Sequence, residues 1–589
     1  MKRRNFLKQL GVLSASPFVL NGMPMQIMES NQLLRAAANT NEDRILVLIQ
    51  LHGGNDGINS LIPIDLYDDY YNLRPNIAIP SRGARSFIPL DNTLDNKSQI
   101  GLHPDLLDFK YMYDRGNLAI IQNVGYEQLN QSHFRSQDIW LSGINSDEVI
   151  KDGGWIGRFL DDQYEVYPFE EDNFDNLAFQ DPLGIEIGST VSLGFHSADV
   201  GGPTALALSN PEAFANLINS VGVDPLTCTD PSLITGARYR DKLKYIMDIE
   251  SQSNSYASLL AKYYQAGSNS PSVTYPERYH MNAPGAVMKN SLSGQLKMIS
   301  RLISGGCKTR VYLAKLGGFD THAEQVESYD PTVGFHASLL YHVASAMRAF
   351  HDDLNRQGLG DKVISMTFSE FGRRAVSNYS FGTDHGKAAP MFICGDKVNG
   401  GIYNQENTEN QTGINGAIGE HPIYNHGKNP NIKKSYIEGE GRGNITPTVD
   451  YRQVYASVLE DWFEVDTAKV RNQILPSLDS NLLKIEGLIG SRTLSVDDDN
   501  FISNRFKFKT VYPNPVSSTA TFEFYVNDTG LTSITLYNIN GQEVLKVIDK
   551  EMKAGSFKVD KDLSVLEPGI YMAVLTQGDK KLTQKIIKK

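Results

Sequence analysis

The sequence has few cysteines, no long apolar run and no excess of basic residues. Its three cysteines among 589 residues are too few for a disulfide framework or a zinc site built from thiolates. No stretch reaches the ~18 apolar residues that a membrane-spanning helix requires. The 56 basic and 68 acidic residues give a net charge of −12, so the chain lacks the basic surface of a nucleic-acid-binding protein. What remains is a composition of 40% hydrophobic residues, which is ordinary for a globular protein of several domains.

Three common catalytic motifs are also missing. The sequence contains no His-Glu-x-x-His helix motif, no Gly-x-Ser-x-Gly elbow and no Walker loop ending in Gly-Lys-Ser/Thr. The mechanisms that depend on these motifs therefore have no support in this sequence.

The N-terminal residues form a pattern that is not typical of a globular fold. Arg3 and Arg4 are followed by Asn5-Phe6-Leu7-Lys8 and then by a short, moderately apolar segment at 10–20. The pattern resembles a twin-arginine export signal, although a basic N-terminus followed by a short helix would look similar. We expect residues 1–40 to be a signal and linker that directs the folded protein to the twin-arginine export machinery.

Apolar runs rich in leucine and β-branched residues are typical of strands that are buried on both faces of a sheet. Each such run in this chain leads into a polar loop, and most of these loops are rich in glycine. Segments with helical periodicity alternate with the runs, so we expect a doubly wound, mainly parallel α/β sheet within residues 41–490. The predicted strands are Arg44–Leu51, Leu118–Gln122, Thr309–Leu316 and Val363–Phe368, and the predicted helices are 237–265, 286–304, 335–354 and 449–463.

The pattern changes near residue 500. Short segments of alternating polarity, such as Thr521–Tyr525 and Ser533–Tyr537, are separated by turns such as Asn540-Gly541. We therefore predict a linker at 491–508 and a small all-β, immunoglobulin-like sandwich at 509–589.

Aspartate and histidine residues occur in the loops that follow the predicted strands. Because ligands bind beyond the carboxyl ends of strands in open α/β sheets, we expect these loops to converge at one edge. Mixed Asp and His ligands suit zinc, although magnesium, manganese and calcium remain open, and the set is sufficient for one or two ions. The candidate metal ligands are Asp56, Asp320, His322, Asp384 and His385.

Two further residue types suggest how such a site could react. A serine hydroxyl held by a divalent ion is easily deprotonated, which makes Ser132 a candidate nucleophile. Arg373, with Arg374 beside it, could stabilise an anionic transition state through bidentate hydrogen bonds. The reaction type that this combination favours is displacement at phosphorus or sulfur.

Several candidates have structural interpretations that the sequence leaves open. Asp56 precedes a glycine and could be a turn residue. Asp320 and His322 could form a capping pair in a loop. Ser132 could be a helix N-cap, with His133 in the first turn of that helix.

Other polar residues are equally ambiguous. Arg373 and Arg374 could be an ordinary pair of surface residues. The histidines of the predicted helix 335–354 are expected to be structural, although the first of them could reach the site, and two later histidines in loops could each be an additional ligand. These residues are His336, His342 and His351 on the helix, and His421 and His426 in the loops.

The motifs in these loops resemble a known family. They are LHGGNDGINSLIP at 51–63, LHP at 102–104, NQSHFRSQDIW at 130–140, GGFDTHAEQ at 317–325, SEFGRR at 369–374, GTDHG at 382–386 and TVDYRQVYASVLEDW at 448–462. Together they are similar to an uncharacterised, often twin-arginine-exported family with a sulfatase-like fold of the alkaline-phosphatase superfamily. In that superfamily the chain order is an Asp ligand, a Ser/Thr nucleophile, an Asp/His pair, an adjacent Asp-His and a late His. Asp56, Ser132, Asp320 with His322, and Asp384 with His385 follow this order.

The sequence departs from the superfamily pattern in three respects. One residue separates Asp320 from His322, where many members have three. The Cys/Ser-x-Pro-x-Arg signature is absent, which disfavours a formylglycine sulfatase. The late His is not resolved between His421 and His426.

The C-terminal region has its own resemblance. Tyr512–Pro515, Leu536–Gln542, Gly569–Tyr571 and the terminal Lys588-Lys589 resemble a type IX secretion sorting domain of Bacteroidota. This resemblance implies passage through the periplasm and across the outer membrane by the type IX machinery, followed by release or surface attachment.

We therefore expect a secreted, metal-dependent hydrolase that acts on an anionic phosphate or sulfate ester through the Ser132 nucleophile. The alternative is a non-catalytic surface or extracellular binding protein that retains the alkaline-phosphatase-like fold. Neither interpretation includes nucleic acid as a partner or a membrane span.

Overall fold

The structure is a computed structural model of the chain, and it describes most of two compact units. The larger unit extends to Ser491 and the smaller one comprises Arg492–Lys589 with two short segments, 91–95 and 114–116. Most of the predicted signal and linker at 1–40, Cys228, His421, His426 and most of the predicted helix 237–265 lie outside the described residues. The described residues are 18–20, 23–25, 44–145, 153–163, 181–197, 205–208, 259–403, 443–490 and 507–589, except for 93, 95–98, 446, 480, 527–528, 539–540, 554 and 579.

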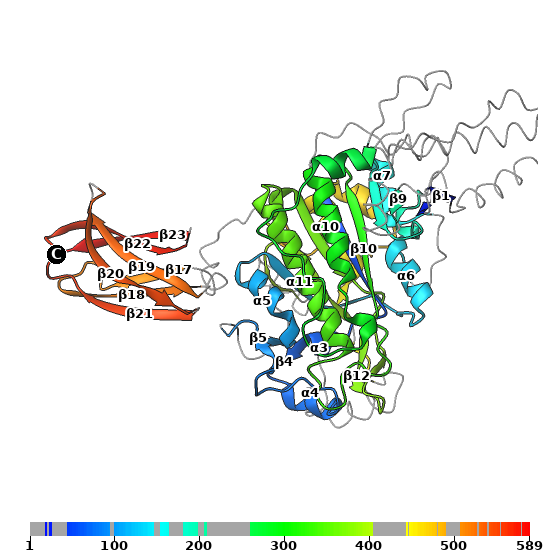
Figure 1. Cartoon of the computed structure of the whole chain (residues 1–589), viewed down its shortest axis with the longest axis horizontal. Coiled ribbons are helices and arrows are strands. Elements are labelled where there is room, and N and C mark those ends of the chain that lie inside the picture. Colours follow the sequence, from blue (N-terminus) through cyan, green and yellow to red (C-terminus); the bar gives the residue numbers. More distant parts are fainter. Residues whose placement is uncertain are drawn as a thin grey trace, which may run out of the picture. The chain divides into compact units, whose positions relative to one another are not determined.

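A nine-stranded mixed sheet forms the centre of the described part of the larger unit (Figure 1). The order of the strands is β15-β7-β14-β11-β3-β10-β8-β9, and β16 also pairs with β7. The central strands are buried along nearly their whole length, as their apolar runs predict. The strand bounds are β3 Ile45–His52, β7 Leu118–Gly125, β8 Gly184–Ile187, β9 Ala205–Leu208, β10 Val311–Gly317, β11 Val363–Phe368, β14 Ala389–Cys394, β15 Gly401–Tyr403 and β16 Val449–Asp450.

The direction of the strands confirms the predicted, mainly parallel sheet. β3 pairs in parallel with β10 and β11, β8 with β9 and β10, and β7 with β15 and β16. Among the described strands of this sheet, only β14 is antiparallel to its neighbours, which are β11 and β7. The carboxyl ends of β3, β7, β10 and β11 therefore lie at the same edge.

Helices cover one face of the sheet with a cluster of aromatic side chains. These helices are α6 (His133–Ser142), α7 (Trp155–Gln163) and α13 (Tyr451–Ser457). The tryptophans of α6 and α7 stack on tyrosines of α13, with centroid distances of 4.5 Å for Trp140–Tyr451 and 4.4 Å for Trp155–Tyr455. The stack joins the same buried cluster as alternate residues of the strands, and so fixes α6 against the sheet.

Another group of helices packs on the opposite face. It comprises α5 (Leu107–Asp114), α10 (Ser291–Ser304) and α11 (Phe335–Arg356), and α10 and α11 lie side by side (Figure 1). Phe109 of α5 packs on Phe392 of β14 with ring centroids 4.6 Å apart. With helices on both faces, the predicted doubly wound arrangement is confirmed.

Two helices begin later than their periodicity predicts. The predicted helix 286–304 starts at Ser291, because Asn290 caps it by accepting a hydrogen bond from the Ser293 amide. The predicted helix 449–463 starts at Tyr451, because Asp450 forms a capping box with Gln453, and it continues as a π-helical turn over 458–462.

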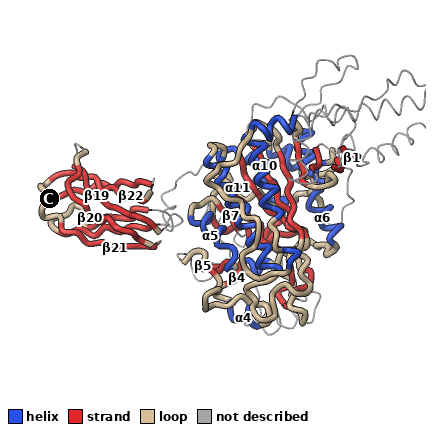
Figure 2. Tube along the Cα trace, in the orientation of Figure 1, coloured by secondary structure: helices blue, strands red, loops and turns tan. Residues whose placement is uncertain are grey.

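The C-terminal part of the smaller unit is all-β over the described residues of 507–589 (Figure 2). Its strands form one sheet of order β17-β18-β21 and another of order β20-β19-β22-β23. Alternate residues such as Phe522, Phe524, Ile534 and Leu536 fill a core of its own, which confirms the predicted all-β region. The bounds are β17 Lys507–Tyr512, β18 Thr519–Val526, β19 Gly530–Asn538, β20 Glu543–Met552, β21 Gly555–Asp562, β22 Gly569–Gln577 and β23 Lys580–Lys588.

The helices and the cysteines of the described residues can be compared with the expectations from composition. None of the helices in the described ranges is long and apolar enough to cross a membrane. Cys307 and Cys394 are both buried free thiols, and Cys394 lies within β14 as a small hydrophobic residue, as predicted.

Candidate metal centre

Loops from the carboxyl ends of β3, β7, β10 and β11 meet at one edge of the sheet. The β3 loop joins the β11 loop where the Gly53 amide donates to Glu370 Oε1 at 2.8 Å. The β7 loop reaches the same carboxylate through His133, and the β10 loop joins them through Asp320, which bonds Arg373 at 2.7 Å. Gly53 has φ +123, and a Cβ there would lie 2.2 Å from the Asp320 amide, so only glycine allows this approach.

A short hairpin carries the last predicted ligands. It consists of β12 (Arg373–Ser377) and β13 (Thr383–His385), and Arg373 pairs directly with His385. The pairing holds His385 beside Asp320, at 3.1 Å between Nε2 and Oδ1.

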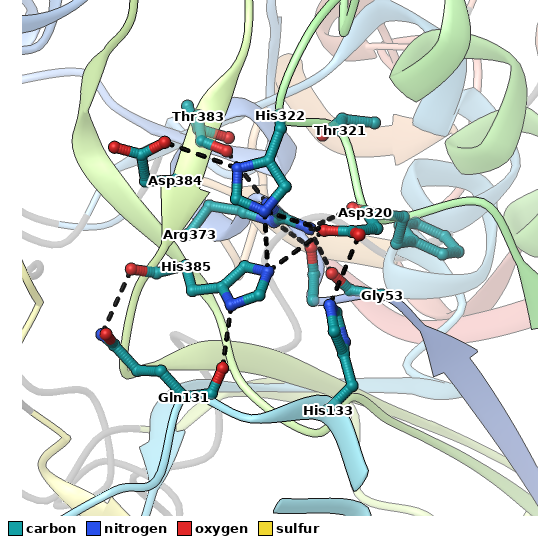
Figure 3. Close-up of polar contacts among 12 residues, drawn as sticks. Gly53, Gln131, His133, Asp320, Thr321, His322, Arg373, Thr383, Asp384 and His385 are labelled. Atoms are coloured by element: carbon teal, nitrogen blue, oxygen red, sulfur yellow. Dashed lines mark hydrogen bonds and ion pairs between the residues drawn. The ribbon is translucent and has the colours of Figure 1, made fainter.

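Among the residues that the structure describes, one group of three side chains could hold a metal ion. Ligand atoms of His133, Asp320 and His385 all lie within 4.8 Å of one another. His322 lies beside this group, with its Nε2 atom 3.2 Å from Asp320 Oδ1 and 2.9 Å from His385 Nε2. Three imidazoles thus gather around one carboxylate (Figure 3).

The other nitrogen of each imidazole faces an acceptor. His133 Nδ1 lies 2.8 Å from Glu370 Oε1, His385 Nδ1 lies 2.9 Å from the Gln131 carbonyl, and His322 Nδ1 lies 3.4 Å from an Asp384 oxygen. If each Nδ1 carries the proton, each Nε2 presents a lone pair towards Asp320.

The donor set fits a divalent metal of the zinc type. His133 Nε2 is buried without a hydrogen-bond partner and lies 3.4 Å from Asp320 Oδ2. Imidazole nitrogens oriented by an acceptor at the other ring nitrogen, together with a carboxylate, are typical zinc ligands. These residues would hold an ion through three nitrogens and one carboxylate.

Charges around the group favour an ionised carboxylate. Burial opposes ionisation of Asp320, but the hydrogen bond and the positive charge of Arg373 outweigh it and lower the pKa of Asp320 to about 2. The hydrogen bond to Glu370 raises the pKa of His133, whereas burial lowers the pKa of His385. Asp320 is thus an anion over the whole physiological pH range.

Arg373 is buried rather than exposed, which contradicts the interpretation of a surface pair for this residue. Its guanidinium donates to backbone carbonyls of three loops and to the Asp320 carboxylate. Each guanidinium nitrogen has at least one acceptor within the protein, so Arg373 ties the loops together at the site. Its role in stabilising a transition state stays a prediction. The carbonyl acceptors are those of Gly53, Gly54, Phe319 and Thr383.

Asp56 lies at the N-terminus of the short helix α3 (Gly57–Ser60) and has partners within the protein. Its Oδ2 atom accepts from Arg74 and from Gln325, each at 2.6 Å, and the side chain is fully buried. Burial opposes ionisation, but the Arg74 charge outweighs it and holds the pKa of Asp56 below its usual value. The structure does not bring Asp56 into the ligand group.

Asp384 and Arg374 flank the group on its exposed side. Asp384 contacts His322 Nδ1 through one oxygen and Arg374 through the other, at 3.5 Å. The Arg374 side chain is partly exposed and also donates to the His385 carbonyl at 3.2 Å. Arg374 is therefore the arginine of this pair that can meet a solvent-borne anion.

Ser132 occupies the N-cap position of α6, one residue before His133. Its side chain makes no capping hydrogen bond, and its amide donates to Asn130 Oδ1 at 2.8 Å. The residue is exposed and stands between Gln131 and His133, which both contact the group. The geometry leaves its hydroxyl accessible from solvent.

The sequence predicts no ligand role for His133 and no defined role for Glu370. It predicts only that His133 lies in the first turn of a helix, and His133 is the first residue of α6. The signal that could have found it is its position in the loop after β7, at the same edge as the predicted ligands.

The histidines of α11 are structural, as predicted. His336 is buried and its Nε2 atom lies 3.0 Å from Asn55 Oδ1, and His342 Nε2 lies 2.8 Å from the Val287 carbonyl. His351 contacts Asn117 and Asn355. None of the three belongs to the ligand group of the described residues.

The fold and the site define an α/β protein with a cluster of His and Asp at the carboxyl edge of its sheet and a separate β unit at its C-terminus. Residues 231–416 match a family described as "Protein of unknown function (DUF1501)", and residues 510–589 match the "Secretion system C-terminal sorting domain". The chain therefore carries a DUF1501 domain and a C-terminal type IX sorting domain, and the latter indicates secretion to the cell surface or beyond it.

Comparisons with whole proteins add little. No curated protein matches the sequence. Similar solved structures include a protein in the alkaline phosphatase superfamily from Vibrio parahaemolyticus, with 9% identity, a TM-score of 0.29 and coverage of 99% of this chain and 88% of that one. Another is Ps i-CgsB in complex with k-i-k-neocarrahexaose, with 9% identity, a TM-score of 0.29 and coverage of 82% and 84%. At these TM-scores neither similarity bears on the function of this chain.

Proposed function

We propose that the protein is a secreted, metal-dependent hydrolase of phosphate or sulfate esters. The observation that carries this proposal is the convergence of His133, Asp320 and His385 at the carboxyl edge of the sheet, with ligand atoms within 4.8 Å. The C-terminal sorting domain supports the secreted location. Export by the twin-arginine route remains a prediction from the N-terminal residues.

The ligands in this proposal are His133, Asp320, His385 and His322, with zinc as the favoured ion. A bound divalent cation would supply positive charge that favours ionisation of a nearby hydroxyl and stabilises negative charge on ester oxygens. Asp56 and Asp384 contact Arg74 and His322, so this proposal rests on a single ion rather than the two that the sequence allows.

Two residues of this chain would supply the nucleophile and bind the anionic ester. The Ser132 hydroxyl would attack the phosphorus or sulfur atom of the ester and form a bond from Oγ to that atom. The bond between that atom and the ester oxygen would break, and the alcohol would leave with the electron pair of that bond and the proton of the serine. Water would then release the acid and return the proton to Ser132. Arg374, at the exposed side of the group, would bind the anionic oxygens.

Metal analysis combined with an ester panel tests the proposal. Purified wild-type protein should contain about one divalent ion per chain and should hydrolyse at least one phosphate or sulfate monoester in a chelator-sensitive reaction. Asp320→Asn keeps the shape of the side chain but removes its charge, and should lose both the ion and the activity. Thermal unfolding of the variant confirms that it is folded.

Two outcomes would overturn the proposal. If the wild-type protein binds no divalent ion under conditions where it is folded, the site is not a metal centre. If it binds the ion but hydrolyses no phosphate, phosphonate or sulfate ester, and instead retains glycans or other surface polymers, the alternative of a non-catalytic binding protein holds.

A further inference from the structure

Glu370 is an unusual residue to find beneath this site. Its carboxylate is completely buried, and its Oε2 atom has no hydrogen-bond partner. Burial of a carboxylate is costly unless its oxygens are satisfied, so such a group needs a compensating role. The partners of the other oxygen suggest what that role is.

Oε1 of Glu370 joins two loops. It accepts from the Gly53 amide at 2.8 Å and contacts His133 Nδ1 at 2.8 Å. The first contact ties the loop after β3 to the loop after β11, and the second ties α6 to both. One carboxylate oxygen thereby sets the position of an imidazole that faces Asp320.

The backbone that carries Glu370 is itself held firmly. Ser369 Oγ donates to the Leu51 carbonyl at 2.7 Å and accepts from the Asn55 amide at 3.0 Å. Ser136 Oγ donates to the Glu370 carbonyl at 2.5 Å, which links this backbone to α6 directly. The carboxylate and the imidazole are therefore anchored on the same frame.

Packing restrains the His133 ring further. It lies 4.9 Å from the Phe371 ring and 4.5 Å from the His385 ring, and it stacks on His52 at 5.9 Å between centroids. Packing alone does not select which ring nitrogen carries the proton. An anionic acceptor at Nδ1 does select it, since it favours the tautomer with the proton on Nδ1 and the lone pair on Nε2.

We propose that Glu370 is a positioning residue that fixes the orientation and tautomer of His133 as a metal ligand. This inference rests on the proposed metal centre and adds a function for a residue that touches neither metal nor substrate. A carboxylate behind a metal-binding histidine raises the basicity of the ligand, and its loss typically weakens metal binding 10–100-fold.

The test measures metal affinity rather than activity. Zinc affinity of the full-length protein is determined by competition with a chromophoric chelator for wild type, Glu370→Gln and Asp384→Asn. Glu370→Gln should weaken zinc binding by about 10-fold or more. The matched control, Asp384→Asn, should weaken it by less than Glu370→Gln, because Asp384 is exposed and lies 3.4 Å from its histidine.

A double-mutant cycle separates positioning from general disturbance. In a His133→Gln background, Glu370→Gln should have no additional effect on zinc affinity, since the ligand through which it acts is gone. Nitrogen NMR of the metal-free wild type, at a pH at which the His133 ring is neutral, should also show the His133 proton on Nδ1, and this measurement requires no variant to fold.

The possible results distinguish the two proposals. If wild-type protein binds no zinc, the proposed metal centre fails, and this inference fails with it. If wild type binds zinc but Glu370→Gln binds it equally well, or if the proton of His133 resides on Nε2, only the role of Glu370 is overturned. Equal losses in the wild-type and His133→Gln backgrounds would likewise overturn it.

Discussion

Arg74 donates to Asp56 at 2.6 Å, and both side chains are completely buried. Gln325 donates to the same carboxylate oxygen at 2.6 Å. The negative charge that the sequence offers as a metal ligand is thus already compensated by an arginine 18 residues further along the chain. A metal ion could bind Asp56 Oδ2 only by displacing that arginine or Gln325.

Substitution of Asp56 tests this arrangement. Asp56→Asn should lower the free energy of unfolding of the metal-free protein by about 3–5 kcal/mol, because it leaves the Arg74 guanidinium buried without a charged partner. Urea denaturation measures the change. The number of metal ions bound by the folded variant should remain that of wild type.

A surface ion pair serves as the control. Glu464→Gln removes the exposed partner of Arg44 and should change stability by about 1 kcal/mol or less. If Asp56→Asn instead leaves stability unchanged and removes a bound metal ion, Asp56 is a ligand after all.

The neighbouring arginines of the β12 strand should differ sharply when each is replaced by lysine. Arg373→Lys cannot reproduce the planar set of donors that binds four carbonyls and Asp320, so it should lose about 3 kcal/mol or more of stability together with metal affinity. Arg374→Lys should change stability by less than about 1 kcal/mol. Its expected effect is a higher KM for an anionic ester with metal content unchanged.

Denaturation and steady-state kinetics on the two lysine variants check this prediction. Equal effects of the two substitutions on stability would show that the buried contacts of Arg373 do not hold the loops together. A normal KM for Arg374→Lys and for Arg374→Ala would remove Arg374 from substrate binding.

His336 should make the stability of the larger unit depend on pH. Burial lowers the pKa of His336 to about 4, while the nearby Asp56 charge opposes that shift only in part. The unfolded chain binds a proton at His336 near pH 6.5, and the folded chain does not bind it until about pH 4. The contribution of His336 to the free energy of unfolding should therefore be fully present above pH 6.5. It should fall as the pH drops towards 4, by up to ~1.4 kcal/mol per pH unit.

His336→Gln isolates that contribution. Chemical denaturation at pH values between 4.5 and 7 should show a shallower dependence for the variant than for wild type. The dependence will not vanish, because burial also lowers the pKa of His103 well below its usual value. An unchanged slope would mean that His336 is protonated equally in the folded and unfolded chains.

The strands of this fold could be predicted because each buried run carries its own signal. Val363–Phe368 is apolar throughout and forms β11 at the predicted residues. The edge of the sheet at which the site lies follows from the shared direction of the strands. Asp320 and His385 could therefore be placed near each other from the sequence alone.

The partners of each polar side chain could not be predicted in the same way. Glu370 and His133 are 237 residues apart, and their contact depends on how α6 packs against the sheet. The burial of Arg373 depends on carbonyls in loops that follow other strands. Such contacts arise from tertiary packing, which leaves no periodic signal in a local stretch of sequence.

Ser132 offers the sharpest test of catalysis, because its hydroxyl has no capping role that its removal would disturb. Ser132→Ala should change stability by no more than about 0.5 kcal/mol and leave zinc affinity at the wild-type value. If Ser132 is the nucleophile, hydrolysis of a phosphate or sulfate ester should fall on the order of 10³-fold or more. Ser132→Thr keeps a hydroxyl at this position and should retain more activity than the alanine variant. Wild-type turnover by a folded, zinc-loaded Ser132→Ala protein would exclude Ser132 and leave attack by water as the route to hydrolysis.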